Sequence, residues 1–121
     1  MAHEFEMIQD GLVRLAFIGD INEADVEAFI QDMQPHLDAV TAGGFLNMLI
    51  DASRDGKLSS GARRAFTELN KDPRIRRVGI CHISPFNRVF ATFLMKATGR
   101  QNIGFFDSEA EALVWLNMDD K

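Results

Sequence analysis

The chain has 121 residues, of which 46% are hydrophobic and 26% are charged, and its formal net charge at pH 7 is −5. This length predicts one domain, spanning residues 1–121, with enough chain to bury a core. The acidic balance argues against nucleic-acid binding, which needs a basic face, and to a lesser degree against docking on anionic membranes. The sequence has no secretory signal and no apolar run near the roughly 20 residues of a membrane span, so we expect a cytoplasmic protein.

The first elements are two strands and a helix. The strands, at residues 5–9 and 12–18, are predicted to form a hairpin because an Asp-Gly pair lies between them. Asn22 then has the character of a helix N-cap, and the apolar residues after it recur at helical spacing. Pro35 should kink or end that helix near Gln34. The apolar stripe consists of Val26, Phe29, Ile30, Met33 and Leu37.

A strand, a charged loop and a second helix are predicted in the middle of the chain. The strand covers residues 46–50 and ends at residues 51–53. The loop covers residues 54–57, where charged residues and a glycine replace the apolar run. The helix covers residues 60–70, opens at a Ser-Ser-Gly sequence, and is stopped by Pro73.

The remaining elements are a strand at residues 77–83, a helix at residues 86–98 ended by a glycine, and a short strand at residues 103–106. Ser108 and Glu111 have the spacing of a capping box and open the last helix. The apolar stripes are Phe86, Phe90, Phe93, Leu94 and Ala97 on one helix, and Ala112, Trp115 and Leu116 on the last.

The predicted order ββαβαβαβα indicates an α/β fold with a mixed, mostly parallel sheet and right-handed crossovers. In the predicted strands, small or polar residues share a face: Asn47 with Asp51, Gly79 with Cys81, and Gly104 in the last strand. We therefore expect an N-terminal hairpin and four helices that lie mostly on the other face.

Two loops that follow neighbouring parallel strands carry the candidate ligand-binding residues. Such loops are where open α/β sheets bind ligands, and helix N-termini suit anions. The candidates are Ser53, Arg54, Ser59 and Ser60 in the first loop, and Ser84, Asn87 and Arg88 in the second. Together they predict a site for a small anionic ligand, a phosphate or a carboxylate.

Each of these residues also has a purely structural interpretation. Ser59 and Ser60 suit a helix N-cap, and a phosphoserine there would also be tolerated by the helix dipole. In the second loop, Ser84 suits a cap, Pro85 the first helical position, and Arg88 a solvated surface.

The other reactive side chains do not converge on a site. Cys81 is the only cysteine and is expected to be a small buried residue, while His3, His36 and His82 lack metal-ligand spacing. No acid, base and nucleophile come together. We therefore expect no catalytic residue, no metal, no cofactor and no enzymatic activity.

Two groups of side chains suit a partner. The basic group is either a solvated face or a contact patch for an acidic protein. The Phe-rich helix at residues 86–98 is either core, or it leaves room for an apolar pocket or a dimer contact, and we expect a homodimer. The basic group consists of Arg63, Arg64, Arg74, Arg76 and Arg77.

Three segments carry a family resemblance: residues 49–53, residues 77–80 and, above all, residues 102–116, in which two phenylalanines are followed by acidic residues and alanines and then Trp-Leu. With this element order, the chain resembles the STAS domain of anti-sigma-factor antagonists. It resembles more closely the SpoIIAA-like family, which is related to STAS and CRAL-TRIO domains. The resemblance covers nearly the whole chain.

The resemblance implies a STAS-like α/β domain with no established enzymatic chemistry. Antagonist members carry Asp-Ser-Ser-Gly, in which the partner kinase phosphorylates a serine; here Ser59, Ser60 and Gly61 match, and Leu58 stands at the Asp position. It implies a regulatory module that binds a protein partner or a small anionic ligand, with phosphorylation at Ser59 or Ser60. Lipid-binding relatives imply the alternative, a carrier of an apolar or lipid-like molecule near residues 86–98.

Overall fold

The computed structural model describes residues 3–40 and 44–118. Within them the elements follow the predicted order ββαβαβαβα. The strands are β1 (Glu4–Gln9), β2 (Leu12–Ile21), β3 (Leu46–Leu58), β4 (Ile75–Cys81) and β5 (Ile103–Phe106). The helices are α1 (Glu23–Asp38), α2 (Ser60–Leu69), α3 (Pro85–Thr98) and α4 (Glu109–Leu116).

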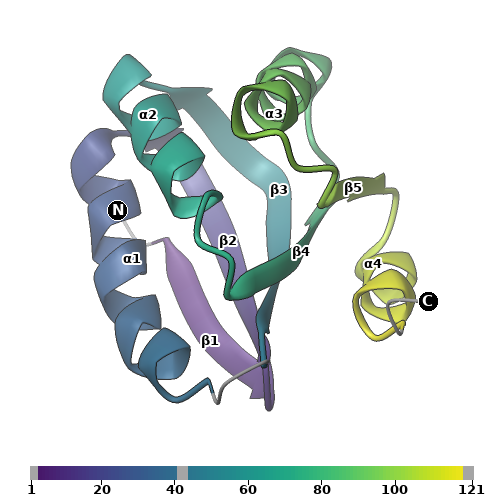
Figure 1. The fold of residues 1–121 in the computed structure, drawn as a ribbon. Helices are drawn as coiled ribbons and strands as arrows, with labels where there is room; N and C mark the ends of the chain where they lie inside the picture. The colour runs from purple at the N-terminus through teal and green to yellow at the C-terminus, as the bar shows by residue number, and fades with distance from the viewer. Residues whose placement is uncertain (1–2, 41–43, 119–121) are drawn as a thin grey trace.

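The five strands form one sheet whose spatial order, β1-β2-β3-β4-β5, is the order of the chain (Figure 1). The β1–β2 pair is antiparallel and the other pairs are parallel, as predicted for a mixed, mostly parallel sheet. At the hairpin turn, Gly11 has a φ of +77°, a conformation that glycine adopts without strain. The predicted N-terminal hairpin is therefore confirmed.

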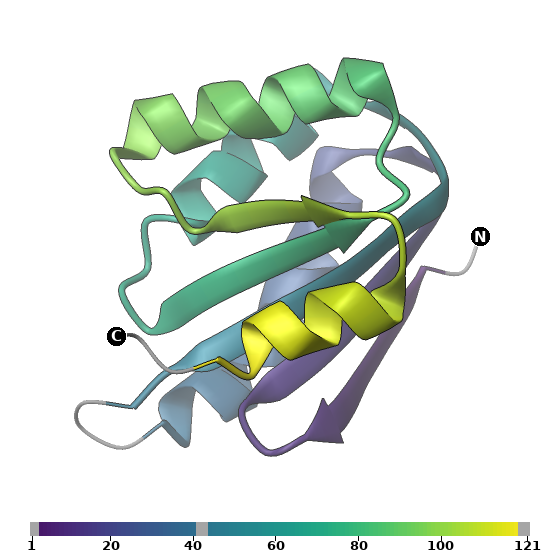
Figure 2. The ribbon, with the colours of Figure 1, turned by 90° about the vertical axis from the view of Figure 1, so that its right-hand side faces the viewer.

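Helices α1, α2 and α3 lie on one face of the sheet, and α4 lies alone on the other (Figures 1 and 2). This confirms that the helices are mostly on one face. The three crossovers β2–α1–β3, β3–α2–β4 and β4–α3–β5 all step in the same direction. Since parallel crossovers are right-handed, their helices fall on the same side. The helix after β5 leads to no further strand and is free of this constraint.

The small residues expected on one sheet face lie under α4. A Cβ atom added at Gly79 would lie 3.4 Å from the Cβ of Ala112 and 3.4 Å from a methyl of Leu116. Cys81 is fully buried in the same cluster, as predicted. Small side chains on this face therefore let one short helix approach the sheet closely.

Helix capping follows the sequence signals. Asn22 and Asp25 form a reciprocal capping box on α1, and Ser108 accepts a hydrogen bond from the Glu111 N–H on α4. Gly99 ends α3 in the left-handed conformation, with a φ of +72°. These local signals set the ends of the helices.

The prediction that Pro35 ends the first helix near Gln34 was wrong, because α1 continues to Asp38. A proline removes only its own N–H from the helical ladder. The Pro35 carbonyl still accepts a hydrogen bond from the Ala39 N–H at 3.1 Å. Leu37 in this last turn is buried, and its packing holds the turn in place.

The predicted loop at residues 54–57 is also corrected, because it belongs to β3, which runs on to Leu58. Strand β2 likewise extends beyond residue 18 to Ile21, and the two strands stay paired to their ends. Charged side chains are compatible with a strand whose edge is paired and whose outer face is solvated.

The predicted apolar stripe on α3 was partly wrong. Phe86 and Phe93 are 71% and 68% exposed, and Ala97 is exposed as well. The buried residues of α3 are Asn87, Ala91 and Leu94, and Phe90 is half-buried. The buried stripe of α3 is therefore rotated around the helix axis by about one residue position from the stripe that hydrophobicity predicted.

The β4 strand ends at Cys81, two residues before the predicted end. The next residue, His82, has a φ of +61°, which breaks the extended conformation. Among the helices of the described residues, none has the length and apolar character that a membrane crossing needs.

Candidate functional site

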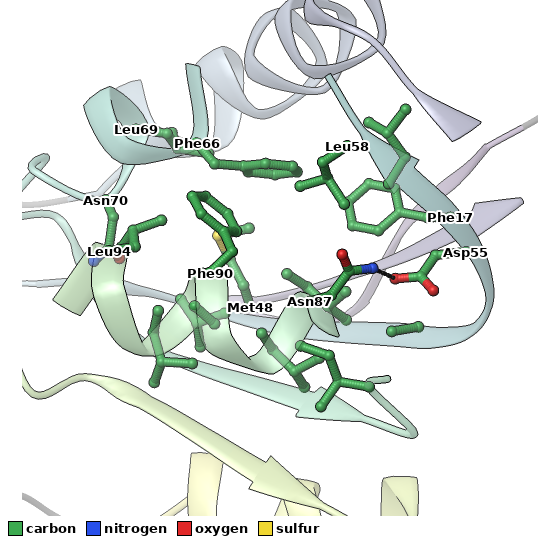
Figure 3. Close-up of a pocket in the computed structure, with 18 of the residues that line it drawn as sticks. Phe17, Met48, Asp55, Leu58, Phe66, Leu69, Asn70, Asn87, Phe90 and Leu94 are labelled. Atoms are coloured by element: carbon green, nitrogen blue, oxygen red, sulfur yellow. Dashed lines mark hydrogen bonds between the residues drawn. The ribbon is translucent and has the colours of Figure 1, made fainter. Parts of the chain in front are cut away.

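An apolar pocket lies between α2, α3 and the sheet face that these two helices cover (Figure 3). Its cavity volume is about 80 Å³. Its wall comes from every strand except β1, from both helices and from Ile83 after β4. A mostly apolar lining with a few polar groups is the usual character of a small-ligand site.

Aromatic side chains form one side of the pocket. Phe17 comes from β2, Phe66 from α2 and Phe90 from α3, and Phe17 contacts Phe66 edge-to-face with ring centroids 5.6 Å apart. On its other side Phe17 contacts Phe29 of α1 at 5.1 Å. The aromatic wall is thus fixed to the main core, while Phe90 stands on the facing helix.

The β3 residues that line the pocket reveal two bulges. Their spacing changes from two residues to three along the strand, in the series Met48, Ile50, Ala52, Asp55 and Leu58. The pairing with β2 shifts at the same places, between Asp51 and Arg54 and between Asp55 and Leu58. Each shift adds one residue to β3 and reverses the face on which the next side chains lie. The first bulge therefore turns Asp55 toward the pocket, and the second does the same for Leu58.

Asp55 and Asn87 form the polar end of the pocket. The Asn87 Nδ2 group donates hydrogen bonds to the Asp55 carboxylate at 3.0 Å and to the Gly56 carbonyl at 3.2 Å. These bonds connect the first turn of α3 to the end of β3, as Figure 3 shows for the Asp55 bond. Asn87 is only 6% exposed. The first turn of α3 is therefore fixed by a buried amide rather than by an apolar side chain.

The pKa of Asp55 lies above its usual value. Burial is the main cause, the hydrogen bond from Asn87 acts in the opposite direction, and the negative charge of Asp51 adds to the rise. A carboxylate with a raised pKa that faces a largely apolar cavity is typical of binding sites.

Gly56 allows β3 to reach this position. A Cβ atom there would lie 2.3 Å from the Asp20 Oδ1 atom and 2.9 Å from the Asp20 backbone nitrogen. The same Asp20 oxygen accepts a hydrogen bond from the Lys57 N–H at 2.9 Å. The second bulge is therefore a close contact between β3 and the end of β2 that only glycine fits.

The opposite end of the pocket is closed by a pair of amides. Asn70 and Asn102 donate to each other's side-chain oxygens at 3.2 and 2.9 Å, and both residues are buried. The backbone carbonyl of Asn70 also accepts from Arg100 at 2.8 Å. The C-terminal end of α2 is thereby attached to the segment that leads into β5.

The residues predicted to bind an anion lie around the pocket rather than in it, with one exception. Ser59 accepts a hydrogen bond from the Ala62 N–H, and Ser84 accepts one from the Asn87 N–H, so both are helix N-caps. Ser60 is exposed in the first turn of α2. The exception is Asn87, which lines the pocket.

The two predicted arginines have other partners. Arg54 lies 3.7 Å from the Glu4 carboxylate, and the Arg88 guanidinium lies 4.4 Å from the centroid of the Phe105 ring. The exposed Ser53 donates its N–H to the Asp51 carboxylate. Within the described ranges, no hydrogen bond or ion pair joins the first-loop candidates to Ser84, Asn87 or Arg88. The anion site they were predicted to form stays a prediction.

The five arginines of the basic group have different partners. Arg74 pairs with Asp72 at 2.8 Å, and Arg64 lies 3.9 Å from Glu23. The guanidinium groups of Arg76 and Arg77 lie over the rings of Phe45 and Trp115, at 4.7 and 5.0 Å. Arg63 donates to the Leu58 carbonyl.

The titratable residues outside the pocket form no metal-binding group. Over residues 3–40 and 44–118, no three His, Cys, Asp or Glu side chains are placed to hold a metal ion. Burial raises the pKa of the Cys81 thiol to about 11, with the nearby Glu109 and Asp51 charges acting in the same direction. The Cys81 thiol is therefore protonated at neutral pH and is a poor nucleophile.

Sequence reasoning missed Asp55 as a site residue and most of the apolar lining. Asp55 stands in a charged run that was read as a loop, and only the pairing with β2 shows which way it points. The one signal available was Gly56 next to it, since a glycine inside a strand often marks a bulge.

Solved structures share this architecture at low sequence identity. The anti-sigma factor antagonist SpoIIAA in its unphosphorylated form is 17% identical with a TM-score of 0.69, and the match covers 98% of this chain and 100% of that one. The phosphorylated form of the Bacillus cell fate determinant SpoIIAA is 18% identical with a TM-score of 0.62, covering 96% and 100%. An uncharacterized protein with a SpoIIAA-like fold from Shewanella loihica PV-4 is 21% identical with a TM-score of 0.71, covering 95% and 92%.

These likenesses support the fold alone, because all three identities are low. Among curated proteins none matches the chain. The family model described as SpoIIAA-like matches residues 12–117, which include every element from β2 to α4. With this match over most of its length, the chain belongs to the SpoIIAA-like family.

Proposed function

We propose that this protein is a non-enzymatic module that binds an apolar small molecule in the pocket between α2, α3 and the sheet. The observation that carries the proposal is the pocket itself, an apolar space with Asp55 and Asn87 at one end and the paired amides of Asn70 and Asn102 at the other. Of the functions expected from the sequence, the carrier of an apolar or lipid-like molecule near residues 86–98 fits this geometry best.

The energy available from such a pocket is sufficient for moderate binding. A ligand that buries about 200 Å² of apolar surface gains about 5 kcal/mol from removal of that surface from water. Loss of translational and rotational freedom offsets part of this gain. We therefore expect dissociation constants in the millimolar to sub-millimolar range for short aliphatic or aromatic probes.

Toluene is a suitable first probe, because it has no polar group and reports on the apolar space alone. We expect it to shift the methyl and ring resonances of Phe66, Phe90 and Leu94, which line the pocket. Filling the space by Ala91→Leu should weaken this binding several-fold. The matched control is Ala97→Leu, since Ala97 is on the exposed side of the same helix. Toluene shifts that are absent, or equal in both variants, would refute the proposal.

A protein partner is the second candidate, and the outer face of α3 favours it. Phe86, Val89 and Phe93 are 71%, 69% and 68% exposed on that face. Together they offer roughly half of the ~800 Å² that each partner buries in a stable interface. The proposed occupant is a second copy of the chain, because a two-fold contact would cover the same stripe on both copies.

Sedimentation at micromolar concentration tests the homodimer. We expect a dimer mass that is lost in Phe93→Ser and kept in Phe45→Ser, because Phe45 is exposed away from α3. A monomer mass for the unchanged chain would exclude this candidate. It would leave the apolar pocket untouched.

A further inference from the structure

We propose that the polar end of the pocket selects a ligand with a hydrogen-bond-donating head group, such as a hydroxyl or an N–H, and rejects carboxylates and phosphates. This inference rests on the proposed binding of an apolar molecule in the same pocket. It concerns only the two side chains at its polar end, Asp55 and Asn87.

The orientation of the Asn87 amide is fixed by its partners. Both groups that contact its Nδ2 atom, the Asp55 carboxylate and the Gly56 carbonyl, can only accept hydrogen bonds when Asp55 is ionised. The amide nitrogen must therefore face them, and an exchanged amide would put an oxygen against two oxygens. The Asn87 Oδ1 atom has to point the other way.

That oxygen points into the pocket. Figure 3 shows the Asn87 nitrogen directed at Asp55 and the oxygen on the side where Leu58 and Phe66 lie. In the part of the chain that the structure describes, no protein donor contacts this oxygen. Asn87 as a whole is 6% exposed, and the pocket leaves its oxygen accessible to water. A ligand that excludes water from this oxygen without supplying a donor leaves the acceptor unsatisfied in an apolar space, which costs free energy. A ligand hydroxyl or N–H avoids that cost.

Asp55 makes the same end unfavourable for an anion. One of its oxygens accepts from Asn87, and over the described residues no donor contacts the other. Burial raises the pKa of this carboxyl, so even the single negative charge of Asp55 is unfavourable at this site. A ligand carboxylate would bring a second charge and two more acceptors to a place that offers no donor. A hydroxyl or an N–H would instead complete the hydrogen bonding of Asn87.

A matched ligand pair tests the inference on the unchanged protein. Heptyl methyl ether and 1-octanol have the same number of heavy atoms and differ in the hydroxyl donor. We expect 1-octanol to bind about tenfold more tightly than the ether, and octanoate to bind about tenfold more weakly than 1-octanol. Chemical-shift titrations of the pocket resonances give all three dissociation constants.

Two variants assign the preference to the named atoms. Asn87→Leu should remove the difference between 1-octanol and the ether. Asp55→Asn keeps an acceptor for the Asn87 amide and removes the charge, so it should narrow the gap between octanoate and 1-octanol while the hydroxyl preference stays. If Asn87→Leu does not fold, the head-group inference is still tested by Asp55→Asn and by the ligand pair on the unchanged chain.

The outcomes separate this inference from the proposed function. Equal binding of 1-octanol and the ether, or tighter binding of octanoate, overturns the head-group inference while the apolar pocket stands. Pocket resonances that respond to neither toluene nor any aliphatic probe overturn the proposed function as well. Tight binding of 1-octanol, together with weak binding of the ether and of octanoate, supports both the head-group inference and the proposed function.

Discussion

The guanidinium of Arg14 holds the carboxylate of Glu109 through two hydrogen bonds, of 3.0 and 2.9 Å. Arg14 comes from β2 and Glu109 from the first turn of α4, and the same guanidinium also donates to Asp51 of β3 at 3.2 Å. The Arg14 and Asp51 side chains are 17% and 11% exposed, so their contact is largely shielded from water, whereas the Glu109 side chain is 37% exposed. These contacts join the single helix on this face to two strands of the sheet.

Removal of Arg14 should destabilise the protein. Arg14→Met would leave the Asp51 and Glu109 carboxylates close together without their cation, and a loss of about 1–3 kcal/mol in the free energy of unfolding is expected. Urea unfolding measures it. The control is Arg54→Met, whose side chain is 53% exposed and 3.7 Å from Glu4, with an expected loss below about 0.5 kcal/mol. Equal losses in the two variants would contradict this role for Arg14.

Acid should weaken the same contact. The hydrogen bonds from Arg14 lower the pKa of Glu109. Burial alone would raise the pKa of Asp51, but hydrogen bonds from Ser53 and the Arg14 charge outweigh it, and its pKa is lowered. Groups with depressed folded pKa values stabilise the fold above their unfolded pKa of about 4, and this contribution is lost as pH falls through the folded values.

Urea unfolding between pH 6 and pH 3 should therefore show a fall in stability that is shallower in Arg14→Met. A fall of the same steepness in both proteins would mean that other carboxylates cause it.

Asp55 should behave in the opposite way. Its pKa is raised mainly by burial, so its charged form disfavours the fold at pH values above its unfolded pKa. Asp55→Asn keeps the acceptor for Asn87 and is expected to stabilise the protein at pH 7, by less than about 1 kcal/mol. The gain should vanish at low pH, where the carboxyl is protonated in both states. Thermal unfolding at the two pH values measures it, and a loss at pH 7 would contradict the prediction.

Gly56→Ala should disturb the second bulge of β3. The added Cβ would collide with the Asp20 backbone nitrogen at 2.9 Å, which cannot move as freely as a side chain. We expect a loss of about 1–3 kcal/mol in the free energy of unfolding. Lys57→Ala is the neighbouring control, because Lys57 is exposed and contributes its backbone N–H, which alanine keeps. A Gly56→Ala protein as stable as this control would show that the bulge adapts.

The two adjacent serines at the start of α2 should differ in their contribution to stability. Ser59→Ala removes the hydroxyl that accepts from the Ala62 N–H at 3.0 Å, so we expect a loss of about 1 kcal/mol. Ser60→Ala should change the free energy of unfolding little, because Ser60 is exposed inside the first turn. Phosphorylation at either serine stays a prediction, and intact-mass measurement of protein isolated from its own cells tests it.

Features that depend on a few neighbouring residues could be predicted from the sequence. The Asp-Gly turn, the caps at Asn22, Ser108 and Gly99, and the order of the elements were read correctly because each depends on local backbone chemistry. The side of α3 that is buried depends on the partner instead. Phe86 and Phe93 make the more hydrophobic stripe, yet Asn87 is the residue that reaches Asp55.

The pocket could not be predicted because it depends on strand register. A charged run such as residues 54–57 gives no sign of two bulges. A shift of one residue in the register of β3 would put Asp55 on the other face of the sheet. The sheet also lacks the reversal of strand order that opens a crevice at strand ends in many α/β folds. The rule that open α/β sheets bind ligands at the ends of their strands therefore indicated the loops, whereas the apolar pocket lies between the helices and the sheet.

The match between strand order and chain order also bears on how the chain folds. Each new strand joins the edge left by the strand before it, so no strand has to insert between two that are already paired. Pairing between sequence neighbours limits each parallel pair to a single helical crossover, which shortens the loop that has to close before the strands pair. The sheet can thus grow from the hairpin toward β5 in the direction of synthesis, with only one unpaired edge exposed to aggregation at the growing side.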